Sequence, residues 1–357
     1  MDNTGALWAG VSITCGIVVV VKLVMLRRRP EVWWITNLIA FLAIGVGSAF
    51  MINESAVNDF LGTPNVAQLL FNVCVAIAAG AVSIYSYTLR VAQPTAQRIT
   101  QHAGICLAVC VAIVVAWAAA PLHDLSYPHA REIPVTGAVM TYDWIYHIYI
   151  AGVVANMTIC VFATVPLTAH GDPARWAGYE IGVAQVIIVS GQLLYMARLA
   201  VQPIVGAEAL VLAAAADVAI LIGMLGVAAG SITMSVGPHV LQHVRARRLV
   251  GDLRPLWSQL RALHPEVQVS SGILRGSPAL RAERMLIEIG DALSILQVKR
   301  PRDAGADRMT IVVDALRETG LPHDTECVTA AALLPQPTTR AEEEDQVREL
   351  ARRLQRV

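Results

Sequence analysis

Long apolar runs, separated by short polar stretches, fill the first two thirds of the chain. A helix needs about 20 mainly apolar residues to cross a hydrocarbon core of about 30 Å. Seven segments meet this requirement, and none shows the period-two alternation of a barrel strand. Because a backbone in lipid must satisfy its own hydrogen bonds, these segments are predicted to be helices. The expected spans are residues 5–26, 32–53, 66–89, 103–120, 142–168, 177–201 and 207–233.

The last third of the chain has a different pattern. From Gly237 onward it carries 18 Lys and Arg and 16 Asp and Glu, which leaves 9 and 11 for the first 236 residues. Apolar residues at helical spacing predict tail helices at 278–296, 307–319, 324–333 and 340–356. Thr339 and Glu342 have the spacing of a capping box. The expected fold class is therefore all-α: a transmembrane bundle over residues 1–236 and an all-α cytosolic domain over residues 237–357.

Basic residues follow the expected spans in an alternating pattern. The stretches after spans one, three and five hold six arginines, whereas those after spans two, four and six hold only Arg131. Because basic residues favour the cytoplasmic side, the N-terminus is predicted outside and the C-terminus inside. Lysine occurs only at Lys22 and Lys299, which indicates a high-GC bacterial genome and hence the bacterial inner membrane. The six arginines are Arg27, Arg28, Arg29, Arg90, Arg98 and Arg175.

The junction between the two domains contains signals for helix ends. Gly237-Pro238 predicts a break after span seven. The basic, amphipathic stretch that follows either lies along the anionic inner leaflet or continues as a stalk. Further on, the run from Pro255 to Trp257 predicts a new helix start.

Polar residues inside the expected spans are candidates for function because ionisable groups are costly at membrane depth. Asp217, Gln192 and Asn156 fall at similar depth in three spans. Together they predict a midplane site for a proton or a polar ligand. The alternative is that they are hydrogen-bonding links between helices. Lys22 and Glu180 lie one turn from span ends and are expected to reach the headgroups.

A second candidate site lies near the outer ends of spans five and six. Its imidazoles and carboxylates fit a divalent metal site or a pH sensor, although the spacing matches no named metal motif and no metal is assigned. The alternative is an Asp143–Arg198 ion pair that steadies the helix ends. The site is expected to include Asp143, His147, Arg198, His123 and His129.

Several classes of protein are disfavoured. A formal net charge of zero excludes a strongly basic nucleic-acid binder. Span seven has no lysine to carry a retinal Schiff base. Walker, kinase and nucleophile-elbow motifs are not found, so no enzymatic activity is expected. The six cysteines lack disulfide or zinc spacing and are interpreted as small hydrophobic residues.

Three blocks of the tail have a recognisable pattern: residues 253–257, 265–267 and 284–293. In these blocks the chain resembles an actinobacterial family of uncharacterised membrane proteins, often labelled candidate transporters. The family pattern runs Leu-x-Pro-Leu-Trp and later Arg-Val-Ile-Glu-Ile-Arg-Asp, and this chain departs from it at Leu286 and Gly290. The resemblance implies a hydrophobic bundle with a helical tail and mildly favours a regulatory role, but it supplies no mechanism.

These features lead to one preferred function and two alternatives. We expect a non-enzymatic sensor or signal-coupling protein that links an outer or midplane site to the cytosolic helices. The alternatives are a proton-coupled small-molecule transporter that uses Asp217, and a membrane scaffold for cytosolic partners. Expected partners are the lipid bilayer and a cytosolic protein, with no cofactor and no nucleic acid. Leu256 and Trp257 are either docked on the tail core or anchor that protein partner.

Overall fold

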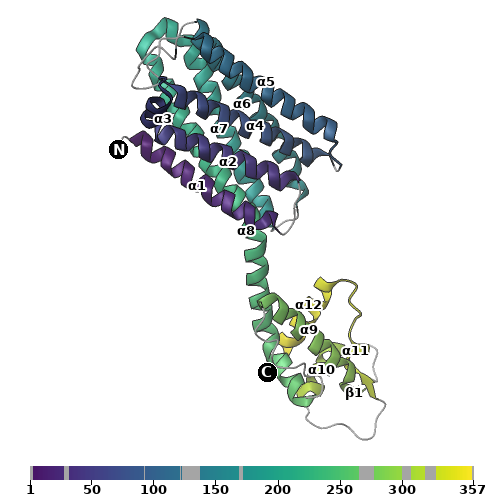
Figure 1. Cartoon of the computed structure of the whole chain (residues 1–357). Helices are drawn as coiled ribbons and strands as arrows, with labels where there is room; N and C mark the ends of the chain where they lie inside the picture. Colours follow the sequence, from purple (N-terminus) through teal and green to yellow (C-terminus); the bar gives the residue numbers. More distant parts are fainter. Residues whose placement is uncertain are drawn as a thin grey trace. The chain divides into compact units, whose positions relative to one another are not determined.

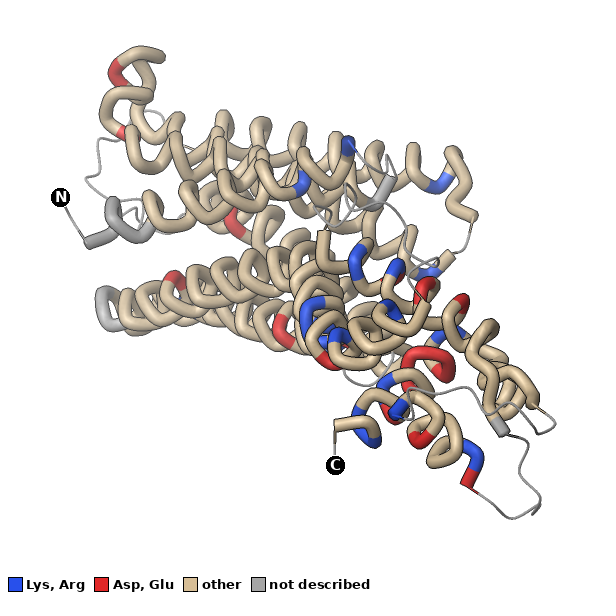
Figure 2. The backbone as a smooth tube through the Cα atoms, turned by 90° about the horizontal axis from the view of Figure 1, so that it is seen from below, with Lys and Arg blue, Asp and Glu red and all other residues tan. Residues whose placement is uncertain are grey.

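The computed structural model describes residues 3–27, 32–91, 93–120, 122, 137–168, 172–264, 277–299, 307–317 and 327–355. Over these residues the fold is nearly all helical, and the chain divides into two compact units, Met1–Pro238 and His239–Val357 (Figure 1). Figure 2 shows the contrast in charge: blue and red segments are sparse along the long helices and frequent in the C-terminal unit.

The first unit is a helical bundle. Seven of its described helices, α1, α2 and α4 to α8, are long and apolar enough to cross a membrane, as expected for a multi-pass membrane protein. This confirms the predicted number of spans. The elements are α1 (Asn3–Leu26), α2 (Val32–Ile52), α3 (Glu54–Leu61), α4 (Val66–Arg90), α5 (Ala96–Ala119), α6 (Gly137–Thr164), η3 (Val165–Leu167), α7 (Pro173–Val205), η4 (Gly206–Ala209) and α8 (Leu210–Leu263).

Helix α5 starts earlier than predicted. The predicted span begins at Ala103, but the helix begins at Ala96 because the polar residues ahead of the apolar run continue its hydrogen-bonded turns. Hydropathy alone therefore underestimates the length of a helix whose first turns are polar.

Glycines allow α7 and α8 to pack closely. A Cβ added at Gly223 would lie 2.4 Å from Cγ1 of Ile188 and 2.7 Å from the carbonyl oxygen of Ala184. Gly230 is similarly close to Ile181, at 2.6 Å. Since lipid tails are as apolar as leucine, helices in a membrane gain from such close backbone approach rather than from the hydrophobic effect.

The predicted helix break at Gly237-Pro238 is wrong, because α8 runs without interruption from Leu210 to Leu263. A Cβ at Gly237 would lie 2.9 Å from Cβ of Pro173, so this glycine provides room for α7 and does not end α8. The new helix start predicted at Pro255 is also wrong, because Pro255 lies within α8.

The second unit has one apolar core under several short elements. Leu253, Leu256 and Leu260 of α8 are essentially unexposed in this core, together with Ile289 and Leu350. The remaining elements are α9 (Pro278–Ile295), β1 (Gln297–Lys299), α10 (Arg308–Arg317), β2 (Cys327–Thr329), α11 (Ala330–Leu333) and α12 (Arg340–Gln355).

The prediction of an all-α tail needs one correction. Part of the segment predicted as helix 324–333 is strand β2, which pairs antiparallel with β1, with Val298 opposite Val328. Only Ala330–Leu333 is helical there. The β-branched residues on both strands favour extended backbone.

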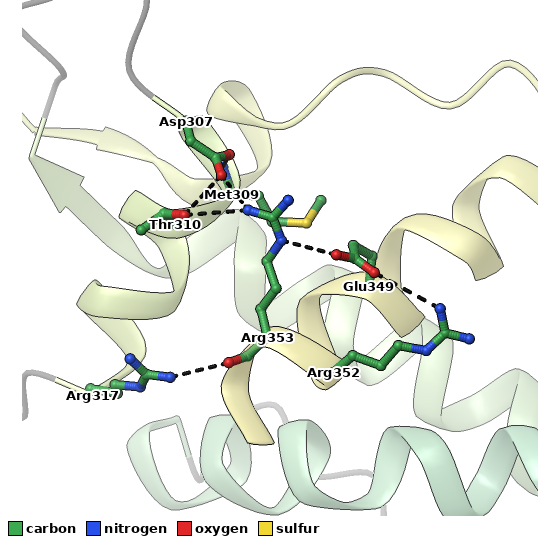
Figure 3. A network of polar contacts seen from close by, with 7 residues as sticks. All are labelled: Asp307, Met309, Thr310, Arg317, Glu349, Arg352 and Arg353. Carbon is green, nitrogen blue, oxygen red and sulfur yellow. Dashed lines mark hydrogen bonds and ion pairs between the residues drawn. The ribbon is translucent and has the colours of Figure 1, made fainter. Parts of the chain in front are cut away.

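Two polar arrangements hold α12 in place. The predicted capping box is present: the Glu342 amide donates to Oγ1 of Thr339 at 3.2 Å, and the Thr339 amide donates to Oε2 of Glu342 at 3.3 Å. At the other end, the Arg353 guanidinium bonds both Asp307 and Glu349 (Figure 3). Arg317 donates to the carbonyl oxygen of Arg353 at 3.1 Å, so α10 and α12 are joined by side-chain and backbone contacts.

Candidate functional site

A group of polar side chains joins α6, α7 and α8 inside the bundle. We call His147, Gln192, Tyr195 and Asp217 the polar cluster. Nδ1 of His147 is hydrogen-bonded to Oε1 of Gln192, and the Tyr195 hydroxyl donates to Asp217. The rings of His147 and Tyr195 stack with centroids 4.7 Å apart and planes 18° from parallel. The stack therefore connects the two hydrogen-bonded pairs into one unit.

The hydrogen bonds define roles for the atoms of the cluster. A carboxamide oxygen can only accept, so Nδ1 of His147 carries the hydrogen in this arrangement. The Asp217 carboxylate accepts from the Tyr195 hydroxyl, which makes a charge-assisted bond when Asp217 is ionised. His147 is 6% exposed and Gln192 2% exposed, so a change of protonation in the cluster would be felt with little screening by water.

Arg198 lies beside the polar cluster on α7. Its side chain is buried and donates from Nε to Oε1 of Gln202 at 2.9 Å. Arg198 interacts electrostatically with both Asp143 and His147. The site therefore combines a guanidinium, an imidazole and two carboxylates. The carboxylates come from different helices, Asp143 from α6 and Asp217 from α8.

Aromatic and amide groups extend the site towards α4. Tyr146 packs edge-on against His147, with centroids 4.9 Å apart. One turn earlier, the Tyr142 hydroxyl accepts from Nδ2 of Asn72 at 2.7 Å, and Asn72 accepts from Gln68 at 3.1 Å. Four helices thus contribute polar groups to one buried region.

The structure regroups the residues expected at the two sites. His147 and Arg198, predicted for the outer face, lie with Gln192 and Asp217, predicted for the midplane. Asn156 is in a different place: it accepts from Arg90 at 2.8 Å and donates to Oγ of Ser86 at 3.1 Å. It lies nine residues from His147 on α6, or about 13 Å at helical rise, so the predicted trio does not form.

The two outer-loop histidines of the second predicted site, His123 and His129, lie outside the described residues. Within the described ranges, no three His, Cys, Asp or Glu side chains lie close enough together to hold a metal ion.

Lys22 is a second buried polar site that the sequence analysis misjudged. It is 2% exposed, so it does not reach the headgroups as expected. Its Nζ donates to Oγ of Ser235 on α8 at 3.0 Å and lies 4.6 Å from the ring centroid of Trp34 on α2. A cation over an indole ring is favourable, so the ammonium finds its partners inside the bundle. Lys22 of α1 thereby contacts both α2 and α8.

The two residues considered as a partner anchor have different surroundings in the C-terminal unit. Leu256 is unexposed in the core, so it cannot contact a partner of the folded unit. Trp257 is half-buried, donates from Nε1 to Oε2 of Glu288 at 2.5 Å and lies under the Arg261 guanidinium. These contacts favour docking on the tail core.

Tyr195 is the residue of the cluster that the sequence analysis missed. Gln192, Tyr195, Arg198 and Gln202 follow one another at spacings of three and four, which places polar groups along one side of α7. This spacing is the sequence signal that marks Tyr195 as a neighbour of Gln192 and Arg198.

Comparisons with known proteins concern only the C-terminal unit. Residues 242–356 match a family of unknown function (DUF6545). The match covers the helical tail, where the sequence resemblance was strongest, and its description carries no activity. No curated protein and no solved structure matches the chain.

Proposed function

We propose that this multi-pass membrane protein is a non-enzymatic sensor that couples the polar cluster in its spanning bundle to its C-terminal helical unit. One observation carries the proposal. Helix α8 supplies Asp217 to the polar cluster and also supplies Leu253, Leu256 and Leu260 to the core of the second unit.

The chemistry of the cluster supports an input role. Ionisable groups at membrane depth are costly and are functional candidates by default. Protonation of Asp217, or a polar ligand that competes for it, weakens its bond to Tyr195 and so changes the contact between α7 and α8. Because α8 continues into the second unit, a displacement of Asp217 can be passed along one helix.

The proposed orientation has the N-terminus outside and the C-terminal unit in the cytosol of a bacterium. It is supported by exposed arginines after the first and third spans, namely Arg27, Arg90 and Arg98, and by the partly buried Arg175 after the fifth. Fusions of a fluorescent protein and of alkaline phosphatase to the C-terminus test it. Fluorescence without phosphatase activity is expected, and the opposite pattern would reverse the assignment.

Hydrogen exchange tests the coupling in the full-length protein in lipid nanodiscs. Protons serve as the probe, because they can be applied without knowing a ligand. Exchange in α9 and α12, corrected for the intrinsic rate, is expected to differ between pH 6 and pH 8. Asp217→Asn should abolish this difference, whereas the control Asp59→Asn, which changes an exposed carboxylate on α3, should retain it.

Two results would replace the proposal with one of its alternatives. If Asp217→Asn abolishes proton-driven uptake in proteoliposomes while exchange in the tail is pH-independent, the protein is a transporter. If the tail binds a cytosolic partner equally well in wild type and Asp217→Asn at both pH values, the scaffold function is favoured.

A further inference from the structure

The side of α9 that faces away from the core carries large apolar residues. Leu280 is 54% exposed, Ile287 56% and Ile295 44%. At 3.6 residues per turn these three lie with Arg284 and Asp291 within an arc of roughly 80°. The opposite side of the helix, with Met285, Ile289 and Leu293, is buried in the core. A helix that is apolar on both sides indicates a second contact surface.

The charges on this outer side have no described partner. In the part of the chain that the structure describes, no ion pair or hydrogen bond involves the side chain of Arg284 or of Asp291. They are seven residues apart, or about 10 Å along the helix, so they do not pair with each other. The outer side of α9 thus presents one positive and one negative group between apolar residues.

The order of these residues is self-complementary in the antiparallel direction. When two copies of α9 pair about an axis between Ile287 and Glu288, Leu280 lies level with Ile295 of the second copy and Arg284 with Asp291. Both contacts occur twice, and the two Ile287 side chains meet at the centre. A parallel pair would instead place Arg284 beside Arg284 and Asp291 beside Asp291. Isologous two-fold contacts are the commonest form of homo-oligomer interface.

We propose that the outer side of α9 binds the same side of α9 in a second copy of this chain, antiparallel and about a two-fold axis. The occupant is a second copy because the surface supplies both charges of each ion pair and both halves of each apolar contact. One short helix offers a small interface. Confinement of both copies to one membrane raises their effective concentration and allows such a weak contact to form. The proposal does not depend on the sensor role.

Cysteine cross-linking in membranes that contain the full-length protein tests the geometry. Ile287→Cys is expected to form a disulfide-linked dimer under mild oxidation, and Leu280→Cys should cross-link to Ile295→Cys when the two differently tagged chains are co-expressed. Leu280→Cys alone should stay monomeric. The wild type, with its six free cysteines, and Arg281→Cys, on an exposed flank of α9, are the controls for background and random collision.

Charge exchange tests the recognition. With Ile287→Cys as reporter, Arg284→Asp or Asp291→Arg alone should lower the cross-linked fraction about 3- to 30-fold, because each variant creates two like-charge contacts. The double variant should restore it. The proposal is overturned if Leu280→Cys dimerises with itself, if Arg281→Cys cross-links as well as Ile287→Cys, or if the double variant behaves like the single ones.

Discussion

The bundle and the C-terminal unit both place arginine beside carboxylate, with different consequences. Arg198 in the bundle is 5% exposed and interacts electrostatically with Asp143 and with His147 of the polar cluster. Arg353 in the tail bonds Asp307 and Glu349 with about a third of its side chain in solvent. Water screens the second arrangement but not the first. The same residue types therefore make a candidate input site in one region and a surface clamp in the other.

The apolar cores differ in a related way. The described residues of the C-terminal unit form one large core, whereas those of the bundle form several smaller clusters. A tail in water is stabilised by burying leucine, but a bundle in lipid gains nothing from moving leucine off the lipid. The comparison predicts that shortening a buried apolar side chain destabilises the tail. In the bundle, a substitution that forces two closely packed helices apart should be the destabilising change.

Leu256→Ala should have the largest effect. Leu256 is unexposed in the tail core, and removal of a buried leucine costs about 2–5 kcal/mol. Hydrogen exchange in the full-length protein should show loss of protection in α9 and α12, with the bundle unchanged. The exposed neighbour Arg254 provides the control Arg254→Ala, which should leave protection intact. Equal protection in both variants would contradict the one-core description.

Gly223→Ala should be the most damaging small change in the bundle. Its Cβ would meet Ile188 at 2.4 Å and the backbone of Ala184 at 2.7 Å, and overpacking costs about 1–3 kcal/mol. The thermal unfolding midpoint of the bundle in detergent should fall. Gly104→Ala has nothing within 4 Å and should not lower the midpoint. A similar midpoint for both variants would show that close approach of α7 and α8 does not stabilise the bundle.

The sequence predicts most of the architecture, because hydropathy over about 20 residues is a local property. The seven spans and the Thr339–Glu342 capping box both depend on residues close together in the chain, and both are confirmed. Gly237 was misjudged because its role depends on Pro173, far away in the sequence. Strand β2 was misjudged because three residues carry too little periodicity to outweigh a neighbouring alanine run.

The candidate site was predicted only in part, because its contacts also join residues that are far apart in the sequence. His147, Gln192 and Asp217 could be named because polar residues are rare in apolar spans. Which of them meet is decided by helix packing, and this separated Asn156 from the others. The place of Lys22 near a span end predicts a side chain that reaches the headgroups, but helix packing brings Trp34 and Ser235 beside it instead.

Trp257→Phe should lower the free energy of unfolding of the tail by less than Leu256→Ala does. The two variants compare a half-buried side chain with a fully buried one. The ring still fills its half-buried place, but the bond from Nε1 to Glu288 is lost. A hydrogen bond to a charged group contributes about 1.5–3 kcal/mol, and partial exposure reduces this to about 1 kcal/mol. Denaturant unfolding of the tail in the full-length protein measures it. Glu288→Ala, which removes the acceptor of this bond, should have a similar effect, and a loss as large as that of Leu256→Ala would mean that Trp257 is a core residue.

The Asp307–Arg353 clamp should give the smallest effect, and one that depends on pH. The hydrogen bond from Arg353 lowers the pKa of Asp307, with further help from Thr310. A carboxylate with a lowered pKa in the folded state stabilises the fold above its unfolded pKa of about 3.9 and loses this contribution as the pH falls through the folded value. Asp307→Asn should therefore weaken the tail by a constant amount from pH 5 to 8.

Below pH 4 the difference between wild type and Asp307→Asn should shrink, because wild-type Asp307 is then becoming protonated. Denaturant unfolding of the tail at a series of pH values measures this difference. Asp314→Asn, which removes a carboxylate 3.7 Å from Arg317 at an exposed position, is the matched control for loss of a surface charge on α10. If Asp314→Asn reproduces the pH dependence, the clamp has no special role. If only Asp307→Asn changes the pH dependence of tail stability, the ion pair between Asp307 and Arg353 stabilises the contact of α10 with α12. Water then weakens this ion pair but does not abolish its contribution.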